Sequence, residues 1–438
     1  MQKKIIALAV AGLVSGAAFA QTNVTIYGVA DGSFEMTKGS GGNGVAVAGT
    51  STNSFASKNR VASNASLIGF RGTEDLGGGL RAVYQFESEL DITSGNAGAG
   101  SGNVRATGLG NRDTFVGLAG GFGTVAIGWL SSPHRSTGAK YDVMPGATGS
   151  GSSLNIIGRV NTGSIYNGIG APGTTAHTFG TNAGTLGPNN AGVIARHSAI
   201  AYTSPKFSGL NGVLVFVPGE TEDNTATAAG RPSRNPSAWN LALHYDMGPL
   251  SVSYSYLDIK DFGAGTAGAT VASTVFDTSG AEKHKAQLLG ARYVFGDTTA
   301  SFMWDTVKSN LADGTGAATG DITNKRNAWY LGLAHKMGAN NVSFAYAKAG
   351  NNSVGLGSRA VAGTDYNTGS GARLLSLRYG YDFSKRTQAY GQWSKISNGQ
   401  NASFDFGTGG TNLQGAGNGA VFAGADPQII NVGIRHTF

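Results

Sequence analysis

Residues 428–438 read QIINVGIRHTF and end the chain on an aromatic side chain. Counted in twos, one side of this stretch is largely apolar: Ile430, Val432, Ile434, His436 and Phe438. The alternation predicts a β-strand whose apolar side runs to the last residue. Chain ends usually fray and carry polar residues. We therefore expect this strand to close the structure, with its apolar C-terminal residues in an apolar environment.

The same alternation recurs in other segments, of which three are clear: LSVSYSYLD (250–258), NVSFAYAK (341–348) and ARLLSLRYGYDF (372–383). One face of each is apolar with aromatic residues towards its ends, and the other carries Ser, Gly and Arg. A soluble β-sandwich would also alternate, but its strands run about five or six residues. The strands expected here run roughly ten to twelve, the length that crosses a bilayer at ~45° tilt.

Tight connections separate these strands at 72–79, 120–123, 204–212, 246–249, 295–298, 336–340 and 382–386. Long connections rich in Gly, Ser, Asn and Thr lie near 37–59, 93–111, 131–193, 219–236, 260–282, 310–325, 350–372 and 398–427. Seven tight and eight long connections join sixteen strands, with both termini on the tight-turn side. Pairing the first strand (23–36) with the last would remove both sheet edges. The prediction is an all-β, 16-stranded antiparallel transmembrane β-barrel.

The first twenty residues have the pattern of a signal peptide. MQKK is basic, IIALAVAGLV is apolar, and Ala18-Phe19-Ala20 is a small-x-small cleavage site. An N-terminal anchor helix is the alternative, but the apolar stretch is shorter than the ~20 residues that span a bilayer. We expect residues 1–20 to be a signal peptide cleaved after Ala20, and residues 21–438 to form the barrel domain.

Composition restricts the classes of function. The 71 glycines and the absence of cysteine suit an exported β-protein that is not held by disulfides. Without Lys3 and Lys4 the chain has 30 basic and 25 acidic side chains, yet no Lys/Arg run longer than two, so nucleic-acid binding is not expected. The seven histidines lack metal-binding spacing, and no nucleophile motif of the Gly-x-Ser-x-Gly type occurs. No metal, no cofactor and no enzymatic activity are expected.

Several segments together resemble the general porins of Gram-negative outer membranes, especially the beta-proteobacterial branch: VTIYGVADGSFE, GFRGTEDLGGGLRAVYQFES, RDTFVGLAGGFGTVAIG, AIAYTSPKFSGLNG and the terminal GIRHTF. The resemblance implies a homotrimer with long extracellular loops, short periplasmic turns and the third long loop folded into the lumen. It also implies partners: outer-membrane lipid, small hydrophilic solutes and inorganic ions, and the insertion machinery that reads a terminal aromatic strand. Phe438 is then expected in the aromatic girdle at the periplasmic rim.

The third long loop, 131–193, is where the family has its constriction. It contains the basic residues His134, Arg135, Lys140, Arg159 and His177. Its one acidic residue is Asp142, so the loop provides few acidic side chains for the constriction.

Strand parity predicts the basic wall opposite this loop. Arg81 is expected to face the lumen if Tyr84 and Phe86 face lipid, and Arg71 if Phe70 does. An outward Phe115 places Arg112 inward, and Arg112 matches a position of the family's basic ladder. Arg292, Arg378 and Arg435 also have lumen parity. The expected constriction residues are Arg71, Arg81, Arg112, Arg135, Lys140 and Asp142.

One position departs from the family pattern. The family commonly has Ser-Arg-apolar-Gly-Phe in the second strand, whereas this chain has Leu67 between Ser66 and Ile68. The expected function is passive diffusion of small hydrophilic solutes and ions with a mild anion preference. Two alternatives remain open: a channel specific for a carboxylate or sugar, and a non-conducting barrel that serves as an adhesin or structural protein.

Overall fold

The computed structural model describes residues 23–40, 55–90, 92–93, 109–144, 149–158, 196–219, 237–260, 282–311, 322–355, 367–400, 402, 404–406 and 424–438. The expected signal peptide, residues 1–20, lies outside these residues. The strands are β1 (Asn23–Ser40), β2 (Phe55–Ser63), β3 (Leu67–Gly77), β4 (Leu80–Glu89), β5 (Thr114–Gly120), β6 (Gly123–Ser131), β7 (Arg196–Thr203), β8 (Leu210–Pro218), β9 (Ser237–Met247), β10 (Leu250–Lys260), β11 (Glu282–Phe295), β12 (Thr298–Leu311), β13 (Ile322–Met337), β14 (Asn340–Ala349), β15 (Ser353–Gly355), β16 (Ala372–Asp382), β17 (Thr387–Asn398) and β18 (Asp426–Thr437).

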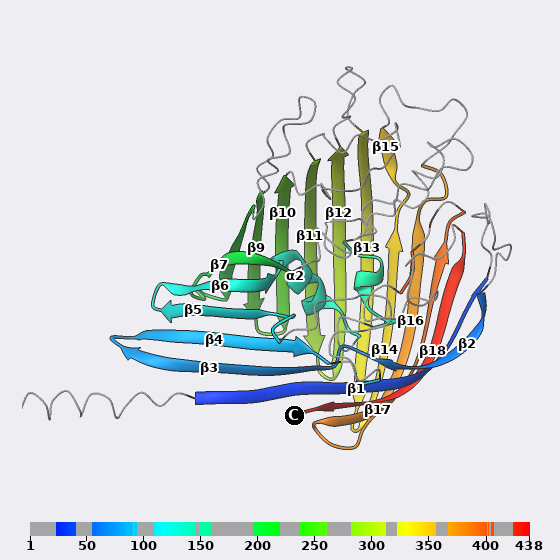
Figure 1. The fold of residues 1–438 in the computed structure, drawn as a ribbon. Coiled ribbons are helices and arrows are strands. Elements are labelled where there is room, and N and C mark those ends of the chain that lie inside the picture. Colours follow the sequence, from blue (N-terminus) through cyan, green and yellow to red (C-terminus); the bar gives the residue numbers. More distant parts are fainter. Residues whose placement is uncertain are drawn as a thin grey trace, which may run out of the picture.

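These strands form one closed antiparallel barrel (Figure 1). The first strand pairs with the last, from Val29 opposite Thr437 to Ser40 opposite Asp426, which confirms the expected closure. β2 and β3 both pair with β1, and β14 and β15 both pair with β13, so each couple fills one position around the barrel. Counted in this way the barrel has the sixteen positions that the sequence predicts.

The two halves of the second position are separated by a kink at Asn64–Ser66. Ala65 has a positive φ of 53°, an unusual conformation for a residue with a side chain. The kink is held by Asp31 of β1, whose carbonyl accepts from the Asn64 N–H at 2.8 Å and whose own N–H donates to the Ser66 hydroxyl at 2.9 Å. One backbone bond and one bond to a side chain thus replace the regular ladder where the chain bends.

All seven tight connections are present. Three of them are two-residue turns whose first central residue is a glycine with positive φ: Gly248 (56°), Gly296 (56°) and Gly338 (62°). This geometry matches the right-handed twist of the flanking strands, and a glycine adopts it without steric cost.

Strand lengths vary more than the expected ten to twelve residues. β1 has 18 residues and β5 has 7. β5 is short because the residues just before it do not continue the regular ladder with β4. The Arg112 N–H donates to the Glu87 carbonyl at 3.0 Å, and the Asn111 side chain accepts from the Glu89 N–H at 2.7 Å.

The faces alternate along each strand as expected. In β10, serines at 251, 253 and 255 are buried on the inner face, while Val252, Tyr254 and Tyr256 face outward. In β18, Ile430, Val432 and Ile434 are exposed on the outer face. No helix among the described residues is long and apolar enough to cross a membrane.

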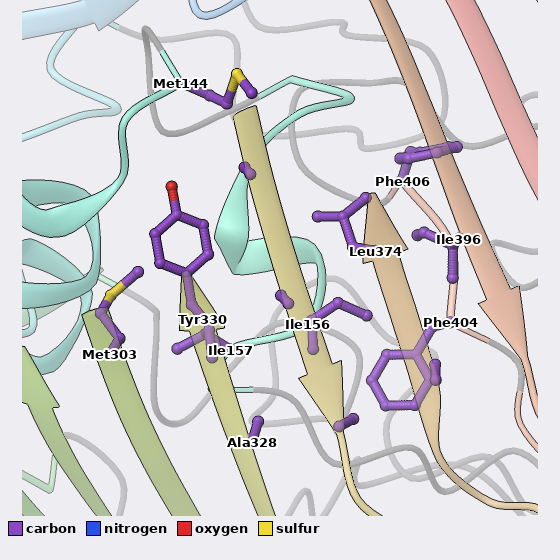
Figure 2. Packing of buried hydrophobic residues seen from close by; sticks show 14 of the residues in the cluster. Met144, Ile156, Ile157, Met303, Ala328, Tyr330, Leu374, Ile396, Phe404 and Phe406 are labelled. Carbon is purple, nitrogen blue, oxygen red and sulfur yellow. The ribbon is translucent and has the colours of Figure 1, made fainter. Parts of the chain in front are cut away.

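The buried core lies inside the barrel, between the wall and the segment 131–158. That segment contains helix α2 (Pro133–Tyr141) and the short helix η2 (Ser153–Asn155), and α2 packs against β8 to β12 (Figure 1). Figure 2 shows Met144, Ile156 and Ile157 of this segment beside residues of β12, β13, β16 and β17. The described part of the third long loop, residues 131–144 and 149–158, therefore lies in the lumen.

Candidate functional site: the lumen and its in-folded loop

Helix α2 begins where its sequence provides a cap. The Ser132 side chain accepts from the Arg135 N–H at 3.1 Å, and Pro133 occupies the first turn, where its missing N–H is not needed. The His134 N–H donates to the Asn240 side chain of β9 at 2.9 Å. The N-terminus of the helix is thus fixed to the barrel wall.

The C-terminus of α2 is fixed by Tyr141, which is fully buried. Its ring lies over Gly290 of β11, where an added Cβ would stand 2.3 Å from the ring. Its hydroxyl is 2.6 Å from the Ser253 hydroxyl and 3.1 Å from that of Ser251. The small residues of β10 and β11 make the room that this ring fills.

Asp142 is the next anchor. One carboxylate oxygen accepts from the Tyr330 hydroxyl at 3.1 Å and the Met144 N–H at 3.0 Å, and the other accepts from the Ser153 N–H at 2.7 Å. Withdrawal from water raises the pKa of Asp142 above its ordinary value, and these donors favour the ionised form and oppose that rise. The structure places Asp142 in the attachment of the loop to β13.

A buried charged group holds segment 131–158 near both of its ends. His134 Nε2 is 3.2 Å from Asp305 Oδ1, and Arg326 Nη2 is 3.5 Å from Asp305 Oδ2, with all three side chains at 0–1% exposure. The Gly158 N–H donates to Asp305 at 3.0 Å, and Arg326 donates to the Ile156 carbonyl at 3.0 Å. The start and end of segment 131–158 therefore meet at one carboxylate.

The loop also reaches the far wall. The Gln392 side chain of β17 donates to the Ser150 hydroxyl at 2.8 Å. With α2 on β8 to β12 and Ser150 on β17, the segment spans the lumen and narrows it.

The remaining wall carries arginines paired with acids. Arg112 donates through Nε to Glu87 of β4, and the Tyr27 hydroxyl donates to the other oxygen of Glu87 at 3.2 Å. Arg60 Nε is 2.8 Å from Glu35. These pairs leave the lumen polar but reduce its net charge.

Phe115 does not face outward, so strand parity does not explain the inward position of Arg112. Phe115 faces inward, since it lies opposite lumen-facing Gln85, while Val116 and Leu118 are exposed outside. Arg112 precedes the strand, which begins at Thr114, so strand parity does not reach it. Its pairing with Glu87 nevertheless brings it to the lumen.

A second polar group lies on β1, β16, β17 and β18. Asp31 accepts from the Tyr390 hydroxyl at 2.7 Å and from Arg435 at 3.0 Å. The Arg378 guanidinium lies 3.6 Å from the centre of the Tyr390 ring and donates to the side chains of Gln388 and Gln392. Arg378 and Arg435 have the lumen orientation that parity predicts.

Two arginines of the expected wall lie apart from this group. Arg71 is exposed and lies over the Tyr27 ring at 5.1 Å. Arg81 is also exposed and lies opposite Asp75 in the β3–β4 ladder, next to the tight turn, whereas α2 packs against β8 to β12. Leu67 shares the face of Gly69 and Arg71, so an apolar side chain stands at the position where the family commonly has arginine.

The structure describes two of the loop's expected constriction residues, Lys140 and Arg135, and they lie in different surroundings. Lys140 Nζ is 2.8 Å from Asp246 of β9, and the Lys140 carbonyl accepts from Arg292 at 3.3 Å. Arg135 is half-buried on α2. Arg159 and His177 lie outside the described residues.

Two features were not predicted from the sequence: the His134–Asp305–Arg326 group and the link of Asp31 to Tyr390 and Arg435. Asp31 alternates on the same lumen-facing side of β1 as Tyr27, so its inward orientation could have been predicted from the sequence. Asp305 also alternates with outward Trp304, but nothing local indicates its partner His134, 171 residues earlier in the chain. Within the described residues no group of three His, Asp or Glu side chains is arranged to hold a metal ion.

Comparison with known proteins agrees with this architecture. The chain is 29% identical over 444 residues to outer membrane porin protein 32 of Delftia acidovorans, with all of both chains covered. It is 26% identical over 392 residues to major outer membrane protein P.IB of Neisseria gonorrhoeae, covering 89% of this chain and 92% of that protein. The solved anion-selective porin from Comamonas acidovorans superposes with a TM-score of 0.64 at 26% identity, covering 95% of this chain and all of that one. Since the profile described as Gram-negative porin matches residues 7–401, the chain belongs to the Gram-negative porin family.

Proposed function

We propose that this protein is an outer-membrane porin through which small hydrophilic solutes and ions diffuse passively, with a mild preference for anions. The observation that carries the proposal is a closed barrel whose lumen is polar and narrowed by segment 131–158. A sixteen-stranded barrel is too wide for its own side chains to fill, so water occupies the rest of the lumen.

The anion preference is supported by the lumen charges. Arg60, Arg112 and Arg435 are each paired with a carboxylate. Arg71 and Arg378 instead contact tyrosine rings, and Arg378 also bonds to glutamine side chains. An excess of guanidinium groups favours anions at a narrow point. One relative of known structure is described as anion-selective, which agrees with a preference for anions over cations.

Within this proposal we assign the constriction to Arg112, Arg135 and Lys140, with Asp142 holding the loop. Arg71 and Arg81 contribute to the field on the wall. These roles are tested by charge reversal: Arg112→Glu or Arg135→Glu is expected to move the reversal potential towards cations, and no movement would place that residue away from the constriction.

Recording from purified protein in planar bilayers tests the function itself. Large ohmic current steps are expected, with a reversal potential in a KCl gradient that favours chloride. Absence of such steps would indicate a structural or adhesive barrel. Saturable block of the current by one carboxylate or sugar would indicate a solute-specific channel.

The proposal extends to export and assembly. We propose that residues 1–20 are removed after Ala20, that the barrel forms a homotrimer as members of this family do, and that Phe438 serves as the terminal signal for insertion. Deleting Phe438 is expected to lower the yield of trimer in membranes far more than it changes the conductance of the barrels that form. An unchanged trimer yield would remove this role from Phe438.

A further inference from the structure

The last long connection, 398–427, also enters the lumen. Two of its described side chains, Phe404 and Phe406, are 4% and 0% exposed. They belong to the same apolar cluster as Ile156 and Ile157 of the in-folded loop (Figure 2). Two loops that are far apart in the sequence therefore meet inside the barrel.

The inward course of this connection is fixed at Asn398, the last residue of β17. The Asn398 side-chain amide donates to the Phe404 carbonyl at 2.9 Å and to the Ala425 carbonyl at 2.6 Å. Its side-chain oxygen accepts from the Phe404 N–H at 2.9 Å. The Asn398 N–H donates to Asp426, at the start of β18, also at 2.9 Å. One asparagine thus ties both ends of the connection to the barrel wall.

The inner wall of β14, β16 and β17 changes from polar to apolar along the strands. Near the tight turns its inward positions carry polar side chains such as Arg378 and Gln392. Towards the long loops they are apolar and fully buried: Ala345, Ala347, Leu374 and Ile396. Apolar surface in a water-filled lumen is unfavourable unless it is covered. Segment 131–158, Phe404 and Phe406 cover it, since they form one cluster with these wall residues.

Phe404 also covers the buried charged group that holds segment 131–158. The Arg326 guanidinium lies 5.5 Å from the centre of the Phe404 ring. The same guanidinium donates to the Ile156 carbonyl at 3.0 Å and lies 3.5 Å from Asp305. An aromatic face attracts a guanidinium, and the ring keeps water away from the ion pair. Phe404 therefore contacts the side chain to which Ile156 is attached.

We propose that Phe404 and Phe406 are positioning residues of the channel. They hold the end of segment 131–158 against the wall, so the last long connection is a second element that fixes the constriction. Their effect is indirect, because both rings are buried and act through Arg326 and Ile156. The inference rests on the proposed channel function, since the position of the segment matters only where solutes pass it.

Thiol labelling tests the proposal, because the chain contains no cysteine of its own. The reporter is I157C, at a position of segment 131–158 that is 0% exposed. A charged, water-soluble methanethiosulfonate should label it slowly in otherwise wild-type protein. In the F404A/F406A background labelling should be about 100-fold faster, because the loss of two buried aromatic side chains favours local opening of the segment. F404L/F406L keeps most of the apolar volume and should restore slow labelling.

Two controls separate this effect from a general loosening of the barrel. A238C, at a buried position of β9 in an apolar cluster that contains neither phenylalanine, should stay slowly labelled in the F404A/F406A background. F295A/F383A removes two exposed phenylalanines at the tight-turn end and should leave the labelling of I157C unchanged. Unchanged labelling of I157C in F404A/F406A, or an equal rise in either control, would overturn the proposal.

Planar-bilayer recording reads the role of the two rings in the channel. F404A/F406A should show more frequent partial closures than wild type, and F404L/F406L should not. Absence of current from wild-type protein would contradict the proposed function, whereas a normal wild-type current that does not respond to F404A/F406A would contradict this inference alone. If F404A/F406A does not show the heat-modifiable migration of a folded barrel, F404A alone replaces it.

Discussion

Gly28 and Phe438 close the barrel by direct contact. The Gly28 N–H donates to the Phe438 carbonyl at 3.0 Å, and the Phe438 N–H donates to the Gly28 carbonyl at 3.1 Å. The Phe438 ring occupies the space beside Gly28, where an added Cβ would stand 2.3 Å from Cζ of the ring. The apolar tail is therefore held at the seam between β1 and β18, where Phe438 is 44% exposed on the outer face.

Replacing Gly28 with alanine is expected to displace the Phe438 ring and weaken the seam. Overpacking of this kind typically costs about 1–3 kcal/mol. The folded fraction in membranes, read from heat-modifiable migration, and the denaturant midpoint should both fall. Gly391→Ala on β17 is the control, because nothing lies within 4 Å of its added Cβ. Equal effects of the two variants would show that the Phe438 contact is not the cause.

Tyr330→Phe is expected to loosen the in-folded loop. The buried hydroxyl of Tyr330 donates to Asp142 and accepts from the Val143 N–H at 3.0 Å, so its removal leaves both loop groups without this partner. The expected cost is about 1–3 kcal/mol. Bilayer recording should show more frequent partial closures than in wild type. Tyr346→Phe, whose ring lies against Trp329 on the outer face, should leave the current trace unchanged.

Arg112→Gln is expected to shift ion selectivity towards cations, because it leaves the Glu87 carboxylate in the lumen without its guanidinium. A unit charge at ~4 Å in water corresponds to about 1 kcal/mol. The chloride-to-potassium permeability ratio should fall about fivefold at low salt and less at high salt. Glu87→Gln should shift the reversal potential the other way, and outward-facing Lys285→Gln should not shift it. A shift of the same sign in both lumen variants would contradict the pairing.

Arg326→Met is expected to destabilise the loop attachment by about 3–5 kcal/mol, since it leaves the buried Asp305 carboxylate without its strongest counter-charge. The double variant D305N/R326M should recover part of that loss. Thermal unfolding in detergent and protease cleavage within segment 131–158 report the effect. Arg373→Met, an exposed arginine on β16, is the matched control. Additive losses in the double variant would mean that Asp305 and Arg326 act independently.

The sequence by itself determined the strands, the tight turns and the two faces of the wall. Alternation in twos and short turn sequences are local properties, so they were readable at β10, β16 and β18 and at all seven turns; six of the seven turns contain glycine, and the turn at 382–386 does not. The closure followed from the count of connections, because an open sheet would leave unpaired edges in the membrane. The lumen orientation of Arg378 and Arg435 followed from the same parity.

Only the tertiary structure decided the inside of the channel. The sequence placed Phe115 on the lipid side because it is aromatic, but it packs inside the barrel against a cluster that contains Leu130 and Leu154. The role of Asp142 depends on Tyr330, and that of Asp31 on Arg435, residues 188 and 404 positions away along the chain. A local pattern specifies which way a side chain points. The partner it meets across the lumen depends on how the whole barrel brings distant strands and the in-folded loop together.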